Sequence, residues 1–286
     1  MLVPAPPSPR PRRCAVTGHD LGAPAREEML RYLENHQQMD GGWGLHIEAP
    51  STIFGTVLNY VAARILGLSA GAPMAEAARG FIRSHGGAVG VPHWGKFWLA
   101  TYGLYEWDGL NPIPPELFLL PYAFPLHPGR MWCHCRMVYL PMSYVYGGRY
   151  TATITPLQEA LRREIYVTPY AEIPWSTLRN VCCDLDLYSA HTRLCNFAFA
   201  VMKRLEPYTP KAAHDAAMAF TLSYIEAEDV QTNWVDIGPV NKVLNMLAVW
   251  YARGSGSEGF RRHAARVVDY LWVAEDGSQR AREACV

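Results

Sequence analysis

The chain has 286 residues, 50% hydrophobic and 18% charged, so it is long enough to bury a sizeable core and unlike a disordered protein. Lys plus Arg and Asp plus Glu each number 26, and no stretch interleaves repeated basic residues with aromatics, which argues against a nucleic-acid partner. Seven cysteines is an odd number, and the proline-rich N-terminus lacks the apolar core of a secretory signal. We therefore expect a reducing, intracellular compartment, and no window is apolar enough to span a bilayer.

Two segments have strong helical periodicity. Apolar residues recur at helical spacing over 54–65, with Ser51 as the expected N-cap. The same spacing recurs over 240–251, after Pro239, which suits a first helical turn, and before Gly254, which suits a helix end. Weaker helical patterns, separated by Gly, Pro, Asn or Asp, cover 25–38, 73–84, 93–106, 156–166, 190–205, 210–227 and 258–272.

These patterns predict an all-α fold, because no stretch alternates persuasively as a strand. Many helices of moderate length with short connections imply helical hairpins around one core, as in a bundle, a solenoid or an α/α barrel, and periodicity alone leaves all three open. We expect the folded domain to span 24–277, between an irregular proline-rich N-terminus over 1–23 and an irregular tail over 278–286.

The segment 111–129, "NPIPPELFLLPYAFPLHPG", is rich in proline but otherwise apolar, which predicts an extended, buried or interfacial connection. It leads into "RMWCHCRMVYLPMSYVYGG", residues 130–148, where Cys133, His134 and Cys135 stand side by side. Three interpretations of this stretch are a metal site, a redox pair and the wall of a pocket.

The residue spacing disfavours the first two interpretations. A structural zinc site generally needs four ligands, and the candidate second pair, Cys182 and Cys183, is adjacent in sequence, so its side chains diverge. A thioredoxin-type pair needs two residues between its cysteines and a βαβ setting. The pocket wall remains, with ordinary core packing as its alternative.

A second aromatic cluster precedes this stretch. The sequence "PHWGKFWLATYGLYEW" brings six aromatic residues into a short span, and it is compatible either with a core or with a pocket. Its aromatic residues are Trp94, Phe97, Trp98, Tyr102, Tyr105 and Trp107.

Three blocks together resemble the oxidosqualene cyclases, the enzymes that fold 2,3-oxidosqualene into lanosterol, cycloartenol or related triterpenes. The blocks are "RYLENHQQMDGGWGLHIE", "GGAVGVPHWGKFWLATYGLYEWDGLNPIPPE" and "MWCHCRMVYLPMSYVYGGRY". The later "DIGPVNKVLNMLAVW" and "DYLWVAEDG" extend the resemblance to Gly277. It implies an α/α barrel, or toroid, of helical hairpins that supplies one of the family's two barrels.

The first block is similar to the family's glutamine-tryptophan repeat, which assigns a structural role to Leu33, Gln37, Gly41 and Trp43. An amide such as that of Gln37 can bond to free backbone groups near a helix end and stack against Trp43, which would clamp neighbouring helices together.

The resemblance also implies a site. Trp94, Trp132 and His134 match residues that line the cyclisation cavity, and Cys135 and Tyr139 match the constriction between that cavity and the substrate channel. Aromatic faces stabilise carbocations without reacting with them. His134 would be the catalytic residue of this group, orienting the final cation or relaying the terminal proton, with a hydrogen-bonded core histidine as the alternative.

The resemblance implies no metal and no redox cofactor, but one part of the family pattern is absent. The family's general acid is an aspartate in an Asp-Cys-Thr-Ala block, and these 286 residues contain no such block. "CCDLD", 182–186, has the wrong order and is set aside as a substitute. We therefore expect an N-terminal-half fragment that is inactive alone and needs the missing C-terminal barrel to close its site.

The implied partners are 2,3-oxidosqualene and a membrane surface that the protein meets monotopically, at the endoplasmic reticulum or a lipid droplet, and no nucleic acid. One alternative function is a non-catalytic module that binds isoprenoids or pairs with a cyclase. Another is an α/α-barrel prenyltransferase subunit, which would need zinc bound by Asp, Cys and His.

Overall fold

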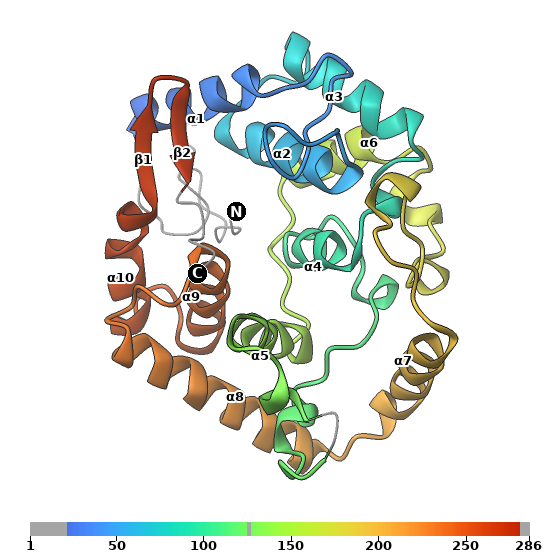
Figure 1. The fold of residues 1–286 in the computed structure, drawn as a ribbon, viewed down its shortest axis with the longest axis vertical. Helices are drawn as coiled ribbons and strands as arrows, with labels where there is room; N and C mark the ends of the chain where they lie inside the picture. Colours follow the sequence, from blue (N-terminus) through green and yellow to red (C-terminus); the bar gives the residue numbers. More distant parts are fainter. Residues whose placement is uncertain (1–21, 125–126, 281–286) are drawn as a thin grey trace.

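The computed structural model describes residues 22–124 and 127–280, and these contain ten α-helices. Helices line the rim of a ring in Figure 1, with α4, α5 and α9 nearly end-on inside it and α1, α3, α7, α8 and α10 towards the periphery. The helices are α1 (Gly22–Asn35), α2 (Ile53–Leu66), α3 (Pro73–Ser84), α4 (His93–Thr101), α5 (Cys133–Gly147), α6 (Pro156–Ile165), α7 (Arg193–Leu205), α8 (Lys211–Gln231), α9 (Pro239–Arg253) and α10 (Glu258–Ala265).

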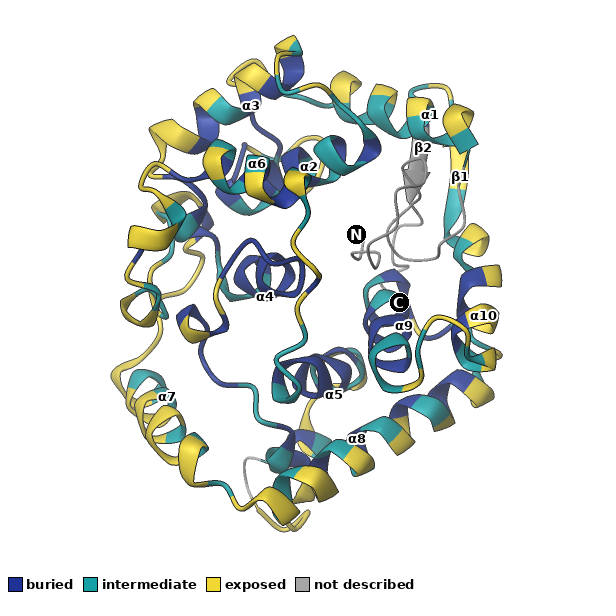
Figure 2. Ribbon diagram, turned by 180° about the vertical axis from the view of Figure 1, so that it is seen from behind, coloured by how far each residue is buried: buried dark blue, intermediate teal, exposed yellow. Residues whose placement is uncertain are grey.

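The core of the molecule lies on the inner helices. In Figure 2, α4, α5 and α9 are mostly buried, whereas α7 is mostly exposed. The inner helices are apolar over much of their circumference, which is the composition expected of helices packed on several sides. Two of them, α4 and α5, carry residues of the predicted cavity.

The N-cap of helix α2 lies one residue later than predicted. Thr52, not Ser51, is the N-cap: its hydroxyl accepts a hydrogen bond from the Gly55 N–H at 3.0 Å. Ser51 instead donates to a carboxylate oxygen of Asp40 at 2.8 Å. The expectation for Ser51 was wrong because two hydroxyl residues adjoin here and tertiary contacts, not local sequence, select between them.

Helix α5 was not predicted, although it carries the most distinctive stretch of the sequence. Pro141 lies inside it, and a proline in the middle of a helix removes one backbone hydrogen bond. The preceding proline-rich segment, predicted as extended, instead forms short 3₁₀ turns at Pro115–Leu119 and Pro128–Arg130. Because of these prolines, the local sequence does not indicate helix α5, which is stabilised by tertiary packing.

The end of the described chain corrects a second expectation. Helix α10 ends at Ala265, and β1 (Leu271–Ala274) pairs antiparallel with β2 (Gly277–Arg280), in a region predicted to be partly helical and partly irregular. Strands of four residues are too short for an alternating pattern to be recognised. Consequently, the described elements begin before residue 24 and continue past 277; of the tail, 281–286 lies outside the described residues.

The hairpin packs on α1. A Cβ on Gly277, whose φ is +126°, would lie 2.7 Å from the carbonyl oxygen of Glu28, so only glycine allows this approach. The Asn35 side chain donates to the Asp276 carbonyl at 3.0 Å. The two ends of the described chain are thereby joined, which closes the ring visible in Figure 1.

Candidate functional site

Helices α4 and α5 bring two of the distinctive sequence blocks together. The indole Nε1–H of Trp94 donates to the Tyr139 hydroxyl at 3.1 Å, and the two rings meet edge to face with centroids 6.0 Å apart. Both side chains are half-buried and pack against the hydrophobic core. The geometry therefore joins the predicted cavity tryptophan of one block to the predicted constriction tyrosine of another.

The start of α5 carries the remaining predicted site residues. Trp132 precedes the first turn and is 65% exposed, and its ring lies against the His134 imidazole with centroids 4.5 Å apart. His134 is half-buried and has no hydrogen-bond partner among the described residues. Cys135 is exposed.

Exposure changes sharply along α5. Cys133 and Cys135 are exposed, whereas Val138 and every residue from Leu140 to Tyr146 are buried. The helix therefore emerges from the core with its first turn at the surface of the described structure. This part of the chain carries an indole, an imidazole and two thiols.

These side chains define what the arrangement can do chemically. Indole and phenol rings attract a cation to their faces, by about 0.5 to 2 kcal/mol depending on desolvation. The imidazole is the one group among the five predicted site residues that can act as a base near neutral pH. None of the five is a carboxylic acid, so the set is suited to shaping and quenching a cation, not to protonating an epoxide.

Most of the aromatic cluster around Trp94 belongs to the core. Phe97 contacts Trp107 edge to face with centroids 5.7 Å apart, and Trp107 contacts Tyr146 of α5 in the same way at 5.8 Å. Its other aromatic residues, Trp98, Tyr102 and Tyr105, are buried as well. Of the six aromatic residues in this block, only Trp94 is not fully buried, which leaves it the one available to a cavity.

The residues matched to the glutamine-tryptophan repeat lie together after α1. The Gln37 amide donates to the carbonyl oxygens of Gly41, at 2.8 Å, and Met74 in the first turn of α3, at 3.0 Å. The buried Trp43 indole donates to the Leu33 carbonyl at 2.9 Å. These bonds connect α1, the following loop and α3; stacking of Gln37 on Trp43 stays a prediction.

Two charged residues to which the sequence analysis gave no role form hydrogen bonds to the backbone around α4. Asp186 accepts hydrogen bonds from the N–H groups of Ile53 and Phe54, at 2.9 and 3.2 Å, and so caps α2. Lys96 is 1% exposed, its ammonium donates to three backbone carbonyls of 178–181, and burial lowers its pKa to about 8. Asp186 therefore has a structural use, consistent with setting "CCDLD" aside as an acid.

A buried polar cluster lies between α8, α9 and α10. Asp229, Asp236 and His263 have oxygen and nitrogen atoms within 4.8 Å of one another, the spacing of a metal site. However, the Lys242 ammonium lies 2.7 Å from His263 Nδ1 and 3.6 Å from Asp236 Oδ2, so a cation already occupies the centre. Burial raises the pKa of Asp229 to about 7 and lowers that of His263 to about 3. We interpret the cluster as a buried hydrogen-bonded network around the Lys242–Asp236 ion pair.

The cysteines of the "CHC" stretch show no comparable grouping. Among the described residues, the sole set of three potential ligands is the Asp–Asp–His group above. Cys133 and Cys135 are exposed on α5, and Cys182 and Cys183 are half-buried in the connection before α7. The geometry gives these thiols no shared centre.

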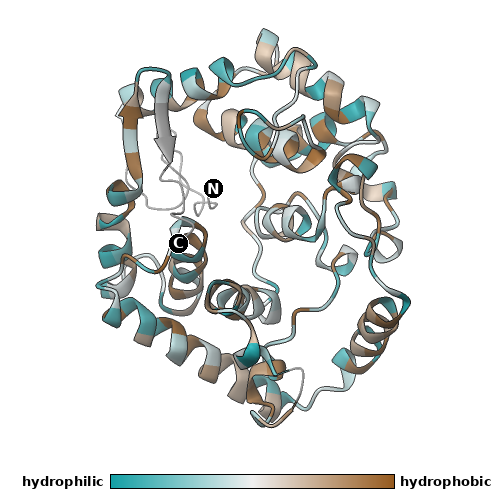
Figure 3. Cartoon of the chain, viewed as in Figure 1, coloured by the Kyte–Doolittle hydropathy of each residue, from teal (hydrophilic) through white to brown (hydrophobic). Residues whose placement is uncertain are grey.

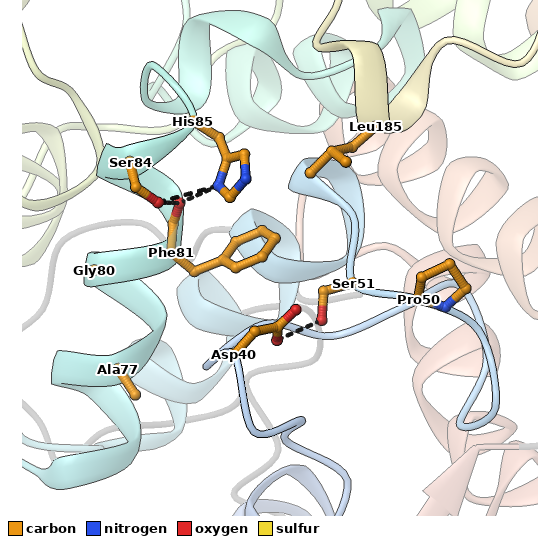
Figure 4. Close-up of a pocket in the computed structure, with 9 residues that line it drawn as sticks. All are labelled: Asp40, Pro50, Ser51, Ala77, Gly80, Phe81, Ser84, His85 and Leu185. Carbon is orange, nitrogen blue, oxygen red and sulfur yellow. Dashed lines mark hydrogen bonds between the residues drawn. The ribbon is translucent and has the colours of Figure 1, made fainter.

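A hollow of about 590 Å³ lies between α3 and the loop at residues 40–51 (Figure 4). Its polar side chains are engaged locally: Asp40 accepts from Ser51, and His85 Nδ1–H donates to the Phe81 carbonyl at 2.8 Å. Ser84 approaches His85, but Asp40 is bonded elsewhere, so the serine-histidine contact lacks an orienting carboxylate. The predicted cavity residues lie on α4 and α5, away from this hollow.

Helix α7 is the most exposed apolar element. None of its residues is buried, and Leu194 is 76% and Phe197 67% exposed. Figure 3 shows α7 as largely hydrophobic, and Figure 2 shows the same helix as largely exposed. Among the described residues, no helix has both the length and the apolar character needed to cross a membrane.

Comparison with known proteins places this architecture in a family. The sequence model for the squalene-hopene cyclase N-terminal domain matches residues 16–276. The chain belongs to this family. The all-α, squalene-cyclase-like fold predicted from the sequence is therefore confirmed, and so is the resemblance to oxidosqualene cyclases.

Curated relatives in the squalene-cyclase family share much of this sequence. Cycloartenol synthase of Dictyostelium discoideum is 52% identical over 265 residues, covering 92% of this chain and 38% of that protein. Human lanosterol synthase is 45% identical, covering 92% and 36%, and alpha-onocerin synthase of Lycopodium clavatum is 40% identical, covering 88% and 34%. The chain thus spans little more than a third of the curated relatives it matches.

Proposed function

We propose that residues 24–277 form one wall of an oxidosqualene cyclase, which converts (S)-2,3-oxidosqualene to a tetracyclic triterpene such as lanosterol or cycloartenol. The observation that carries the proposal is the Trp94–Tyr139 pair, in which an indole N–H donates to a phenol at 3.1 Å and fixes two aromatic rings edge to face. Such a pair presents π-electron density beside an apolar surface, as carbocation chemistry requires.

In this proposal each side chain has a distinct role. Trp94 and Trp132 stabilise cationic intermediates through their ring faces. His134, which has a ring contact with Trp132 but no hydrogen bond to a described side chain, orients the last cation or accepts the terminal proton. Cys135 and Tyr139 narrow the entry to the cavity.

The isolated chain is proposed to be inactive. Trp94, Trp132 and His134 shape a cation, but none of them supplies a strong acid at neutral pH, and the 286 residues contain no Asp-Cys-Thr-Ala block. In the proposed full-length enzyme, a second barrel would contribute the acid and cover the exposed first turn of α5. No metal or redox cofactor takes part in this chemistry.

Helix α7 supports a monotopic membrane association, at the endoplasmic reticulum or a lipid droplet. Leu194, Phe197, Val201 and Leu205 are all exposed and follow helical spacing along one stripe. Arg193 begins the helix and Lys203 and Arg204 lie in its last turn, all exposed. An amphipathic helix with an apolar stripe and basic flanks lies in the interface of an anionic membrane.

A chimeric enzyme tests the proposed function. Residues 24–277 would replace the matching part of Dictyostelium cycloartenol synthase, and both the chimera and the isolated chain would be incubated with 2,3-oxidosqualene. We expect the chimera to form a tetracyclic triterpene, detected by gas chromatography and mass spectrometry, and the isolated chain to form none. Product from the isolated chain, or a folded chimera with no turnover, would contradict the proposal.

The second candidate function is a non-catalytic module that binds isoprenoids or pairs with a cyclase. It is favoured by the exposed Trp132 at the start of α5, an aromatic surface that can contact a lipid without any acid. Lipid that co-purifies with the chain, combined with an inactive but folded chimera, would select this function over the first.

A further inference from the structure

Helix α5 lacks one backbone hydrogen bond near its centre, and a side chain from another helix replaces the missing donor. Pro141 has no N–H, so it cannot donate to the carbonyl oxygen of Met137, four residues earlier. An unpaired carbonyl in a protein interior is costly, about 1 to 3 kcal/mol. The missing backbone hydrogen bond separates the part of α5 that carries His134, Cys135 and Tyr139 from the part that is embedded in the core.

Asn241 of α9 supplies the missing donor. Its Nδ2 amide donates to the Met137 carbonyl oxygen at 2.8 Å, and its Oδ1 accepts the Ile237 N–H at 3.0 Å. Asn241 is 1% exposed, so water does not compete for these bonds. A side chain 104 positions away in sequence thus takes the place of the backbone amide that Pro141 lacks.

The buried polar cluster holds Asn241 in place. Asn245, one turn later, donates to Glu228 Oε2 at 2.9 Å and Asp229 Oδ1 at 3.2 Å, and Asn241 itself lies 3.4 Å from both Glu228 and Asn245. All four of these side chains are buried. Asn241 therefore belongs to a network with many mutually constraining bonds.

The backbone of the loop before α9 is also constrained by the buried cluster. Asn233, Trp234 and Asp236 all have positive φ, between +53° and +67°, which asparagine and aspartate tolerate but which is unfavourable for Trp234. Lys242 donates to the Trp234 carbonyl, and Asn245 donates to Asp236 at 3.4 Å. Strained backbone persists where surrounding contacts determine it, so the cluster fixes both the loop and the α9 turn that bears Asn241.

We propose that Asn241 is a positioning residue for the cavity-lining first half of α5. It replaces the backbone donor lost at Pro141, and hydrogen bonds within the buried cluster of α8, α9 and α10 hold the Asn241 side chain in position. The direction of α5 at Met137 sets where Tyr139 meets Trp94 and where His134 lies. The consequence for cyclisation rests on the proposed function; the positioning itself does not.

A double-mutant cycle tests the positioning. Asn241→Leu removes the donor at nearly constant volume, and Pro141→Ala restores the backbone N–H. We expect amide hydrogen exchange over 138–145 to accelerate about tenfold in Asn241→Leu, the cost of one unsatisfied buried carbonyl. In the double variant the acceleration should fall below about twofold, because the restored backbone N–H at position 141 donates to the Met137 carbonyl.

Asn245→Leu is the matched control, since it damages the same cluster without touching Met137. Equal acceleration in both asparagine variants, or no rescue by Pro141→Ala, would overturn the proposal. Should Asn241→Leu fail to fold, folding of the double variant supports the proposal. Its failure alongside a folded Pro141→Ala protein overturns it.

The same variants in the chimeric enzyme examine the link to catalysis. We expect Asn241→Leu to lower turnover and Pro141→Ala to restore part of it. If the parent chimera is folded but inactive, the proposed function fails while hydrogen exchange still decides whether Asn241 positions α5. If exchange responds as expected but turnover of an active chimera does not change, positioning holds and its catalytic consequence is overturned.

Discussion

The carboxylate of Asp186 accepts a hydrogen bond from the backbone N–H of Ile53 at 2.9 Å, across 133 positions of sequence. A second bond, from Phe54, completes a cap on the first turn of α2. Negative charge at a helix N-terminus also interacts favourably with the helix dipole. One side chain from a short 3₁₀ turn therefore fixes both the start of α2 and the connection that precedes α7.

Replacing this cap gives the first prediction. Asp186→Ala leaves two backbone N–H groups at a buried helix end without their acceptor, and we expect it to lower the free energy of unfolding by about 2 kcal/mol. Asp184→Ala, at a neighbouring exposed carboxylate in the same 3₁₀ turn, is the control and should have little effect. Urea denaturation measures both; equal losses would contradict a capping role.

The second prediction compares two glycines, one in a crowded position and one in open space. Gly41 has φ +85°, and a Cβ there would lie 2.6 Å from the Ala77 carbonyl oxygen, so Gly41→Ala should destabilise the protein by more than about 2 kcal/mol. Gly80 lies inside α3 with open space around it, and Gly80→Ala should stabilise by roughly 0.5 to 1 kcal/mol. Thermal unfolding of the two variants should therefore shift in opposite directions, and shifts of the same sign would refute this account.

The third prediction concerns pH. His93 donates to the Asn111 carbonyl at 3.0 Å, and burial lowers its pKa to about 4, below the ordinary value of about 6.5. Below 6.5 the unfolded chain binds a proton that the folded protein does not, so this contribution to stability is complete above pH 6.5 and is lost as pH falls towards 4.

Substituting the histidine isolates its share of the acid sensitivity. We expect the wild-type protein to lose roughly 1 to 2 kcal/mol more stability between pH 7 and pH 5 than His93→Gln, which keeps a donor but does not titrate. Urea midpoints at the two pH values give the comparison. Parallel losses in both proteins would assign the acid sensitivity to other groups.

The fourth prediction tests α7 at a lipid surface. Leu194→Ser combined with Phe197→Ser removes two exposed apolar side chains, and we expect binding to phosphatidylcholine vesicles that contain phosphatidylserine to fall at least about tenfold. The control is Tyr224→Ser with Val230→Ser, on α8, where two apolar side chains are also exposed, at 57% and 64%. Vesicle flotation measures binding, and a similar fall in both double variants would argue against a specific role of α7.

Sequence reasoning succeeded where local pattern and tertiary packing agree. The start of α9 at Pro239 and its end before Gly254 follow the predicted signals. It missed α5 because Pro141 contradicts a helix locally, and the compensating donor lies on a distant helix. The hairpin was missed because four-residue strands leave no pattern, and their stability comes from packing on α1.

The candidate site divides in the same way. Trp94 and Tyr139 were singled out through resemblance to a family, and their contact is visible only in three dimensions. Asn241 was overlooked, although one signal was available: a proline inside an apolar run implies an orphan carbonyl, and polar residues spaced four apart on a buried helix imply a partner for it. Asn241 and Asn245 have that spacing on α9.

The contact between Gly277 and α1 bears on how the protein is made. Asn35 and His36 meet Asp276 at 3.0 and 3.2 Å, so the first described helix is secured by a residue that is synthesised 241 positions after Asn35. During synthesis α1 is made long before the β1–β2 hairpin, so the two cannot pack together until the intervening helices have been synthesised. Long-range closure of this kind is a slow step, and it exposes nascent chains to chaperones and to mispairing. Vectorial synthesis therefore leaves the ring open until the β1–β2 hairpin has been made.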